Sequence, residues 1–247
     1  MDTRGKEAAA LALHRFGFGP SRNSITAIAA DPRGALLSDL DRPGAGFLSA
    51  KLPSSATAAR AISDFRAEEQ ARSKLAQRAK KEAEAGMAST SDAASMTQPK
   101  PSGPPLPQQV FQNEAAARYE AAVDADIGFV ERLVWFWSNH FCISADKDIP
   151  TAGAYEREAI RAHVLGRFAD MLIAVETHPA MLYYLDNTRS MGAESVAGIN
   201  ADKGINENLA REILELHTLG VRGGYSQTDV TSLANVDPPN GSSACCA

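Results

Sequence analysis

The densest group of side chains that could carry chemistry lies in residues 206–220, which read NENLAREILELHTLG. Helical periodicity predicts an apolar stripe along this segment, and Arg211, Glu212 and His217 lie beside that stripe. A charged side chain next to buried surface is costly unless it is paired, so this arrangement favours a cluster of polar side chains that interact with one another. Carboxylate, imidazole and guanidinium groups together are suited to acid/base chemistry, metal binding or anion binding.

The same helix also has a purely structural interpretation. Asn206 is a suitable N-terminal cap, and Gly220 is a suitable C-terminal stop. Glu207 and Arg211 have the i, i+4 spacing of an ion pair, which contributes about 0.2–0.5 kcal/mol on an exposed face. These roles account for most of the polar residues and leave the three named above as the ones that favour a site.

A second segment with possible chemistry is residues 131–144, ERLVWFWSNHFCIS. Helical spacing places His140 on an aromatic face together with Phe136 and Trp137. Such a histidine is either a satisfied core residue or a ligand or general base, and the spacing leaves both interpretations open.

If these two segments meet, they form a hydrolase-like site that works by metal-assisted or acid/base chemistry. The candidate catalytic residues are His140, Arg211, Glu212 and His217. The candidate ligands of a divalent metal are His140, Glu207, Glu212 and His217. The guanidinium of Arg211 would bind an anion, and we identify no residues for another cofactor.

Several named catalytic motifs are absent from the sequence. It has no HExxH zinc helix, no GxxxxGK[ST] phosphate loop and no GxSxG nucleophile elbow. Residues 200–207, NADKGINE, resemble the start of a calcium loop, but the glycine is misplaced and Arg211 occupies the twelfth position. Any site in this chain therefore lies outside these motif classes.

The elements that must position these residues are predicted to be helices. Helical periodicity is clear in residues 121–142, 154–175, 179–185 and 207–219. Asp31-Pro32 and His178-Pro179 are helix start signals, with Asp31 and either Thr177 or His178 as caps. No run of alternating β-branched residues predicts a strand. We therefore predict an all-α fold, an irregular multi-helix bundle with a disordered Pro/Ser-rich insertion.

The composition changes along the chain and predicts five parts. Residues 86–109 are rich in Ser, Thr, Pro and Gly and bury too little apolar surface to offset the entropy of ordering. The expected parts are an N-terminal helical part (1–55), a charged solvated helix (56–85), a disordered insertion (86–109), a helical core (110–234) and an aberrant disordered tail (235–247).

Bulk properties limit the possible partners. The formal net charge of −5 argues against a nucleic-acid surface along the whole chain, and no apolar run has the roughly 18–20 residues of a membrane span. The N-terminus lacks the pattern of a signal peptide, so we expect a cytoplasmic chain. The three cysteines form neither a disulfide framework nor a CxxC zinc spacing.

Four segments occur in the order HRFGFGP, WFWSNHF, GRFADMLIAVETHPAMLYYLDN and GINENLAREILELHTLGVRGGYSQTDV. Together they resemble the large bacterial family known as domain of unknown function 1800. The resemblance covers residues 8–55 and 110–234 and implies a predominantly α-helical fold with no established activity. Many family members look exported, which implies a periplasmic or exported location as the alternative to the cytoplasm.

The chain departs from the family pattern in two places. Family members often read FWHNHF where this chain has Ser138 in place of the first histidine, which leaves His140 alone. Members also continue beyond the YSQTDV segment, so we expect this chain to be a C-terminally truncated or frameshifted member.

Two functional hypotheses follow. The first is the hydrolase-like site between the helices 131–144 and 206–220. The second is a non-catalytic helical scaffold that binds a protein partner in an envelope-associated assembly, because the charged helix and the Pro-rich insertion suit binding better than catalysis. Convergence of His140, Arg211, Glu212 and His217 would favour the enzyme, and scattered side chains would favour the scaffold.

Overall fold

The computed structural model of the chain describes residues 3–84, 103–147, 150–192, 199 and 204–236. Within these residues every regular element is helical and none is a strand, which confirms the predicted all-α class. The elements are α1 (Thr3–Phe16), α2 (Ser24–Ile28), α3 (Pro32–Leu40), α4 (Ser55–Glu84), α5 (Leu106–Asp124), α6 (Phe129–His140), η1 (Ala145–Lys147), α7 (Ala152–Tyr155), η2 (Glu156–Ile160), η3 (Arg161–His163), α8 (Phe168–Glu176), α9 (Pro179–Tyr184), η4 (Asn187–Arg189), α11 (Asn208–Glu212), η5 (Ile213–Thr218) and α12 (Gln227–Val236).

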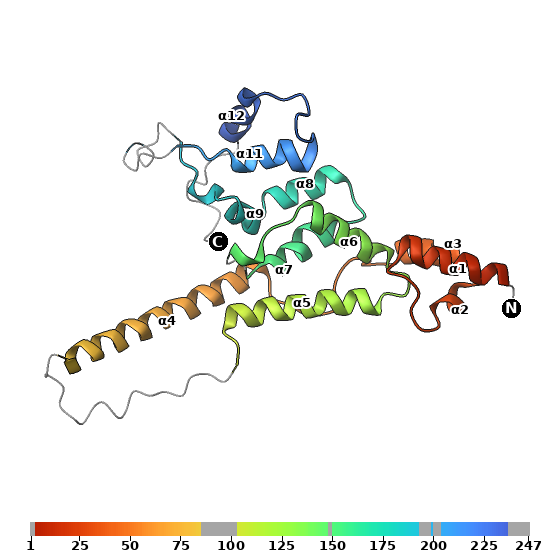
Figure 1. Ribbon diagram of the computed structural model, residues 1–247, viewed down its shortest axis with the longest axis horizontal. Helices are drawn as coiled ribbons and strands as arrows, with labels where there is room; N and C mark the ends of the chain where they lie inside the picture. The colour runs from red at the N-terminus through yellow and green to blue at the C-terminus, as the bar shows by residue number, and fades with distance from the viewer. Residues whose placement is uncertain (1–2, 85–102, 148–149, 193–198, 200–203, 237–247) are drawn as a thin grey trace.

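The central helices α6 to α9 lie between the outer groups of helices (Figure 1). Helices α1 to α3 form one end of the molecule, where α3 packs against α6. Helices α11 and α12 lie beyond α8, and α5 lies on the opposite side of the central group. Helix α4 packs beside α5 at its first turns and then projects away from the body.

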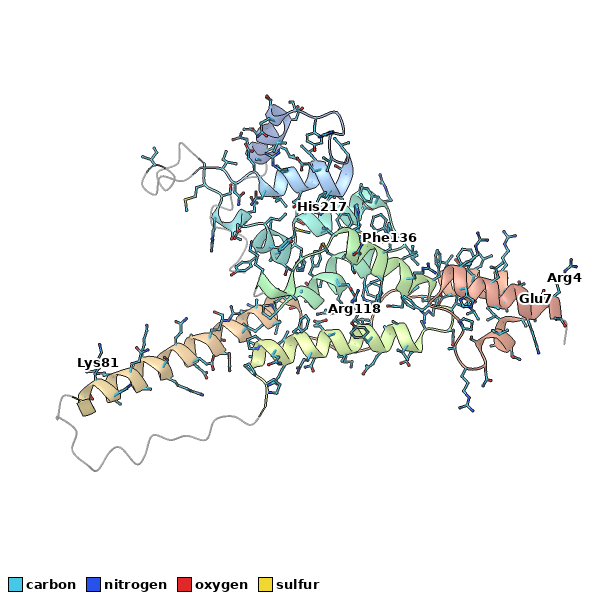
Figure 2. The ribbon with its side chains drawn as sticks, viewed as in Figure 1. Arg4, Glu7, Lys81, Arg118, Phe136 and His217 are labelled. Atoms are coloured by element: carbon cyan, nitrogen blue, oxygen red, sulfur yellow. The ribbon has the colours of Figure 1, made fainter. Side chains whose placement is uncertain are left out.

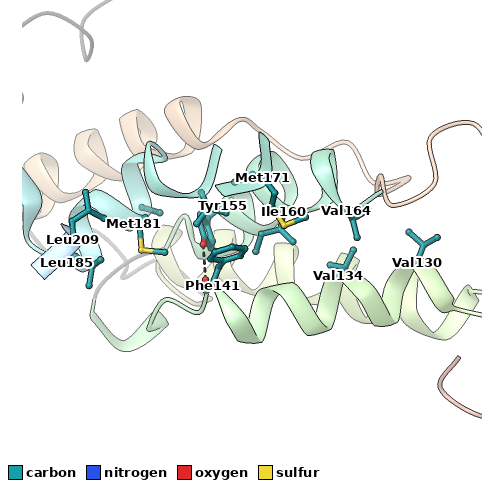
Figure 3. Packing of buried hydrophobic residues seen from close by; sticks show 13 residues of the cluster. Val130, Val134, Phe141, Tyr155, Ile160, Val164, Met171, Met181, Leu185 and Leu209 are labelled. Atoms are coloured by element: carbon teal, nitrogen blue, oxygen red, sulfur yellow. Dashed lines mark hydrogen bonds between the residues drawn. The ribbon is translucent and has the colours of Figure 1, made fainter. Parts of the chain in front are cut away.

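The main core lies where α6, the helix formed by α7 and η2, α8 and α9 meet (Figure 3). Phe141, Ile160, Met171 and Met181 contribute side chains that are no more than 2% exposed. Full burial of a side chain of this size stabilises the fold by about 1.5–3 kcal/mol. The Tyr155 hydroxyl donates to the Phe141 carbonyl at 2.8 Å, so this buried hydroxyl group has a hydrogen-bond partner (dashed line in Figure 3).

Two helices that periodicity predicts as continuous are interrupted, so these two predictions were wrong. Helix α5 ends at Asp124 and α6 begins after Gly128, whose φ of 82° is a left-handed conformation that suits glycine. The second predicted helix, 154–175, is interrupted before α8 because Arg167 is extended, with ψ of 141°. Periodicity did not reveal the interruption at Arg167, because Ile160 and Val164 before it and Met171 and Val175 after it pack in the same core.

Three of the predicted helix ends agree with the structure, whereas the N-cap of α11 is Glu207 and not the predicted Asn206. Asp31 accepts a hydrogen bond from the Gly34 N–H at 2.8 Å, and Nδ1 of His178 accepts one from the Ala180 N–H at 3.1 Å. Gly220 follows the helix that contains His217 and has a φ of 88°, the conformation of a helix-stopping glycine. These signals are local, and the structure therefore preserves them.

Helix α4 is attached to the body at its N-terminus. The backbone N–H and the hydroxyl of Ser55 donate to the two carboxylate oxygens of Glu158 at 2.8 and 2.6 Å. Ala58 and Ile62 are each 2% exposed, whereas every residue from position 67 to position 82 is exposed. The helix therefore has a packed root, residues 55–62, and a solvated projecting part.

Parts of two predicted segments lie outside the described residues. Residues 86–102 of the expected insertion and residues 237–247 of the expected tail belong to this group. Helix α5 begins at Leu106, inside the range predicted as an insertion, so the last residues of that range are helical. Among the helices that the structure describes, none is both long and apolar enough to cross a bilayer.

Candidate functional site

The two candidate histidines lie close together. Nε2 of His140 is 3.3 Å from the backbone carbonyl oxygen of His217, and the two ring centroids are 6.1 Å apart. The ring of His140 packs against Trp137 and Phe141, at centroid distances of 5.5 and 4.6 Å. The structure thus confirms the predicted aromatic face of His140.

His217 is paired with a carboxylate that sequence analysis did not identify. Nδ1 of His217 lies 2.6 Å from Oε1 of Glu176, which comes from the last turn of α8. Both residues are buried, with 5% and 8% of their surface exposed (His217 is labelled in Figure 2). The signal that could have found Glu176 is its i+4 position from Leu172, which continues the apolar stripe of α8.

The chemistry open to this buried pair is proton exchange between an imidazole and a carboxylate. Oε2 of Glu176 is buried and has no hydrogen-bond partner among the described residues. An unmet buried carboxylate oxygen is costly, so the contact with His217 is the interaction that retains Glu176 at this position. The pair connects α8 to the π-helical segment η5, which continues α11.

Arg211 faces a different neighbour, helix α12. Its guanidinium lies 3.2 Å from Glu207, which confirms the predicted i, i+4 pair, 3.3 Å from Glu215 and 3.0 Å from the Gln227 side chain. Glu207 also accepts hydrogen bonds of 2.7 Å from Gln227 and from Thr231. The hydrogen bond from Thr231 is the largest of several causes that lower the pKa of Glu207. This network fastens α11 to α12.

Glu212 lines a groove with a volume of about 360 Å³. The groove is lined by Lys147, Tyr184, Leu185, Asn208, Arg211, Glu212, Glu215 and Leu216. Within the described part of the chain the Glu212 carboxylate has no hydrogen-bond or ion-pair partner. Lys147 donates to the Tyr184 carbonyl at 2.6 Å and to Asp186 at 2.8 Å. The groove therefore brings together two of the four predicted catalytic residues.

The four predicted catalytic residues do not converge on one point. His140 and His217 lie on the side of α8, whereas Arg211 and Glu212 line the groove. Nor do the four candidate metal ligands form one set: across the described ranges, no three His, Cys, Asp or Glu side chains are grouped closely enough to hold a metal ion. The expected metal-binding geometry therefore has no counterpart in this part of the chain.

Sequence analysis missed a buried charge network in the middle of the molecule. Arg161, whose side chain has no exposed surface, donates to both oxygens of Glu131 at 2.7 and 2.9 Å. It also donates to Glu156 at 3.0 Å and to the Gly46 carbonyl at 3.0 Å. Burial disfavours the charged guanidinium, but the hydrogen bonds to Glu131 and the nearby carboxylates outweigh it and raise the pKa of Arg161.

The local backbone explains why the sequence did not reveal this network. Glu156 and Arg161 are five residues apart, a spacing at which side chains on an ordinary α-helix do not face each other. Residues Glu156–Ile160 form a π-helical segment, whose i→i+5 hydrogen bonding brings such residues onto one face. No signal in a single sequence identifies this widening.

Comparison with known proteins gives one match. The family model described as "Protein of unknown function (DUF1800)" matches residues 11–236. No curated protein and no solved structure matches the chain.

Proposed function

Because the chain belongs to the DUF1800 family, whose function is unknown, we propose a function from its own geometry: a non-catalytic helical scaffold that binds an acidic protein partner along α4. The observation that carries this proposal is the solvated projection of α4 beyond Ile62 (Figure 1). The scattering of the four candidate catalytic residues supports the same interpretation. In this proposal the partner belongs to an envelope-associated assembly.

The charge of the projecting part indicates the chemistry of the partner. Residues 63–84, the part of α4 beyond its root, contain six basic and five acidic residues, but five of the basic residues lie between positions 72 and 81, where there is no acidic residue. Glu68 and Glu82 each pair with an arginine on the same helix, at 3.5 and 3.0 Å. Such exposed pairs contribute little to stability, so a complementary acidic surface could compete for the basic residues between positions 72 and 81.

The test is charge reversal on the projecting part, with a matched reversal elsewhere. The test variant carries Lys74→Glu, Lys80→Glu and Lys81→Glu. The control variant carries the same change of net charge on exposed residues of α1 and α3, as Arg4→Glu, Lys6→Glu and Arg33→Glu. Glutamate and lysine have similar helix propensities, so α4 remains helical.

Each variant is purified from its native host in separate envelope and soluble fractions, and co-purifying proteins are quantified. We expect one stoichiometric acidic protein to be retained by the wild type and the control and lost from the α4 variant. Its purified form should bind more weakly as salt increases. The same set of proteins on all three chains, or α4-dependent binding of random-sequence DNA in its place, would contradict the proposal.

A second candidate function is acid/base hydrolysis in the groove that contains Arg211 and Glu212. The observation that favours it is the Glu212 carboxylate, which has no partner among the described residues and lines the same groove as Lys147 and Arg211. The cations would bind an anionic substrate. Glu212 would take a proton from a water whose oxygen adds to the acyl or phosphoryl centre, and would return it to the leaving oxygen.

This candidate is tested with p-nitrophenyl acetate and p-nitrophenyl phosphate as probes. Glu212→Gln should abolish any hydrolysis by the purified chain, whereas Glu120→Gln, at an exposed position on α5, should not change it. Metal analysis of the wild type, His140→Ala and Glu212→Ala tests the metal-assisted form. Equal rates in both Gln variants would exclude Glu212, and equal metal content would exclude the metal ligands.

A further inference from the structure

A second cavity, of about 260 Å³, lies between α5, α6 and the helix formed by α7 and η2. It is lined by Leu48, Phe111, Glu114, Ala115, Arg118, Tyr119, Ser138, Ile143, Ala145, Ala152, Gly153, Tyr155, Glu156 and Ile160. Most of these side chains are apolar, and the charged groups come from two facing elements, α5 and η2. An apolar lining with a few converging polar groups is the usual composition of a ligand site.

Arg118 lines this cavity with a guanidinium that is ion-paired with Glu156 but donates no hydrogen bond to any described residue (it is labelled in Figure 2). Its Cζ lies 4.2 Å over the ring of Trp135, which holds the guanidinium flat by a cation–π contact. Its Nε lies 2.7 Å from Oε2 of Glu156, yet this buried nitrogen has no hydrogen bond to any described residue because the N–H is not aimed at the oxygen. The Arg118 side chain is 30% exposed, so the guanidinium is accessible to a ligand.

The carboxylates that line the cavity are already satisfied. Glu114 accepts hydrogen bonds from Arg157 at 2.9 and 3.4 Å. Glu156 accepts one from Arg161 at 3.0 Å and one from the Ser138 hydroxyl at 2.8 Å. A cationic ligand would have to displace these partners. An anionic ligand would meet the guanidinium of Arg118, which is ion-paired with Glu156 but donates no hydrogen bond to the described residues.

We infer that this cavity binds a small organic carboxylate, with the carboxylate on Arg118 and the apolar part of the ligand against Leu48, Phe111 and Ile143. A guanidinium and a carboxylate match each other in geometry and form charge-assisted hydrogen bonds. The volume lies below the roughly 300–1,000 Å³ typical of pockets for drug-sized ligands, which restricts the ligand to about the size of one aromatic ring.

The experiment compares three probes of similar size and different charge: benzoate, benzyl alcohol and benzylammonium. Titrations followed by ligand-observed NMR on the full chain should show saturable 1:1 binding of benzoate and no saturable binding of the other two. Arg118→Met keeps the length of the side chain and removes the charge. It should weaken benzoate binding about ten- to a hundredfold, the effect of losing charge-assisted hydrogen bonds.

Two further variants keep the inference testable if Arg118→Met folds poorly. Ala115→Leu fills the cavity from α5 without touching a charge and should abolish benzoate binding. Arg72→Met removes an exposed arginine of α4 and should leave binding unchanged. Benzoate binding that persists in folded Arg118→Met or in Ala115→Leu, or preferential binding of benzylammonium, would overturn the inference.

Discussion

Arg161 shows at the scale of single residues how a full charge is accommodated inside a small helical protein. Its guanidinium is completely buried and reaches two carboxylates and a backbone carbonyl. A buried pair of this kind adds little net stability compared with an apolar pair, but removing one partner leaves the other charge buried without compensation. Arg161 therefore offsets part of the cost of burying the Glu131 and Glu156 side chains.

We predict that Arg161→Met lowers the free energy of unfolding by about 3–5 kcal/mol, the usual cost of breaking a buried ion pair. Urea denaturation followed by circular dichroism measures this loss. The control is Arg189→Met, which removes an arginine whose side chain is 76% exposed and should change stability by less than about 0.5 kcal/mol. Similar losses in the two variants would contradict the role assigned to Arg161.

His178 makes two polar contacts through its ring nitrogens, and the one in which Nδ1 accepts a hydrogen bond requires a neutral ring. Nδ1 accepts the Ala180 N–H, so the remaining proton is on Nε2 and faces Glu158 at 3.3 Å. Burial lowers the pKa of His178 from its usual 6.5, and the hydrogen bond to Glu158 opposes this only in part. The folded state therefore binds fewer protons than the unfolded state as the pH falls past 6.5.

It follows that the contribution of His178 to stability is present above pH 6.5 and is lost as the pH falls through its lowered pKa. We predict that the free energy of unfolding decreases between about pH 7.5 and pH 5. His178→Asn, which also caps a helix but does not titrate, should reduce this slope. Urea denaturation at several pH values measures the slope, and an equal slope in both proteins would exclude His178 as its source.

At the scale of elements, the approach of α5 to α7 depends on a glycine. A Cβ at Gly153 would lie 2.2 Å from Cβ of Glu114, a distance that real Cβ atoms do not adopt. Glu114 is fixed at this point because its carboxylate pairs with Arg157, so it has no free direction in which to move. The absence of a side chain at position 153 thus permits this helix contact.

We predict that Gly153→Ala destabilises the protein by about 1–3 kcal/mol, as overpacking of a tight contact does. Gly204→Ala is the matched control, because nothing lies within 4 Å of a Cβ at that position. It should change the free energy of unfolding by less than about 0.5 kcal/mol. Urea midpoints of the two variants provide the comparison, and a neutral Gly153→Ala would show that α5 can shift freely against α7.

At the scale of the whole molecule, the described part consists of a packed helical body and one helix that extends beyond it (Figure 1). The body contains the core, the groove lined by Glu212 and the cavity lined by Arg118. Helices α11 and α12 pack against each other through a small second cluster of Ala210, Val230 and Ala234. The projecting part of α4 has no buried apolar residue, so its helix is maintained by local propensity alone.

We predict that a proline substitution in the projecting part of α4 and one in its root have different effects on the stability of the body. Ala71→Pro, in the projecting part, should reduce the far-UV circular dichroism signal and leave the urea midpoint of the body unchanged. Ala58→Pro, in the root, removes the N–H that donates to Ser54 at 2.8 Å and has no space for the ring. It should cost about 3 kcal/mol or more. A lower midpoint in Ala71→Pro would show that the projection supports the body.

The sequence by itself determined the all-α class, the cap at Asp31, a cap at either Thr177 or His178, and the stop at Gly220. These features depend on residues within a turn or two of one another, and helical periodicity or cap chemistry reports them directly. The interruptions at Gly128 and Arg167 escaped this reasoning because they depend on the backbone rather than on the apolar pattern.

Only the tertiary structure decided which polar groups meet. Glu176 pairs with a histidine 41 residues away, and Glu131 with an arginine 30 residues away, so neither pair has a spacing that a sequence pattern can show. The contact between Glu156 and Arg161 is local but depends on a widened helical turn. Partner choice across helices is determined by how the apolar faces pack, and that packing separated His140 and His217 from Arg211 and Glu212.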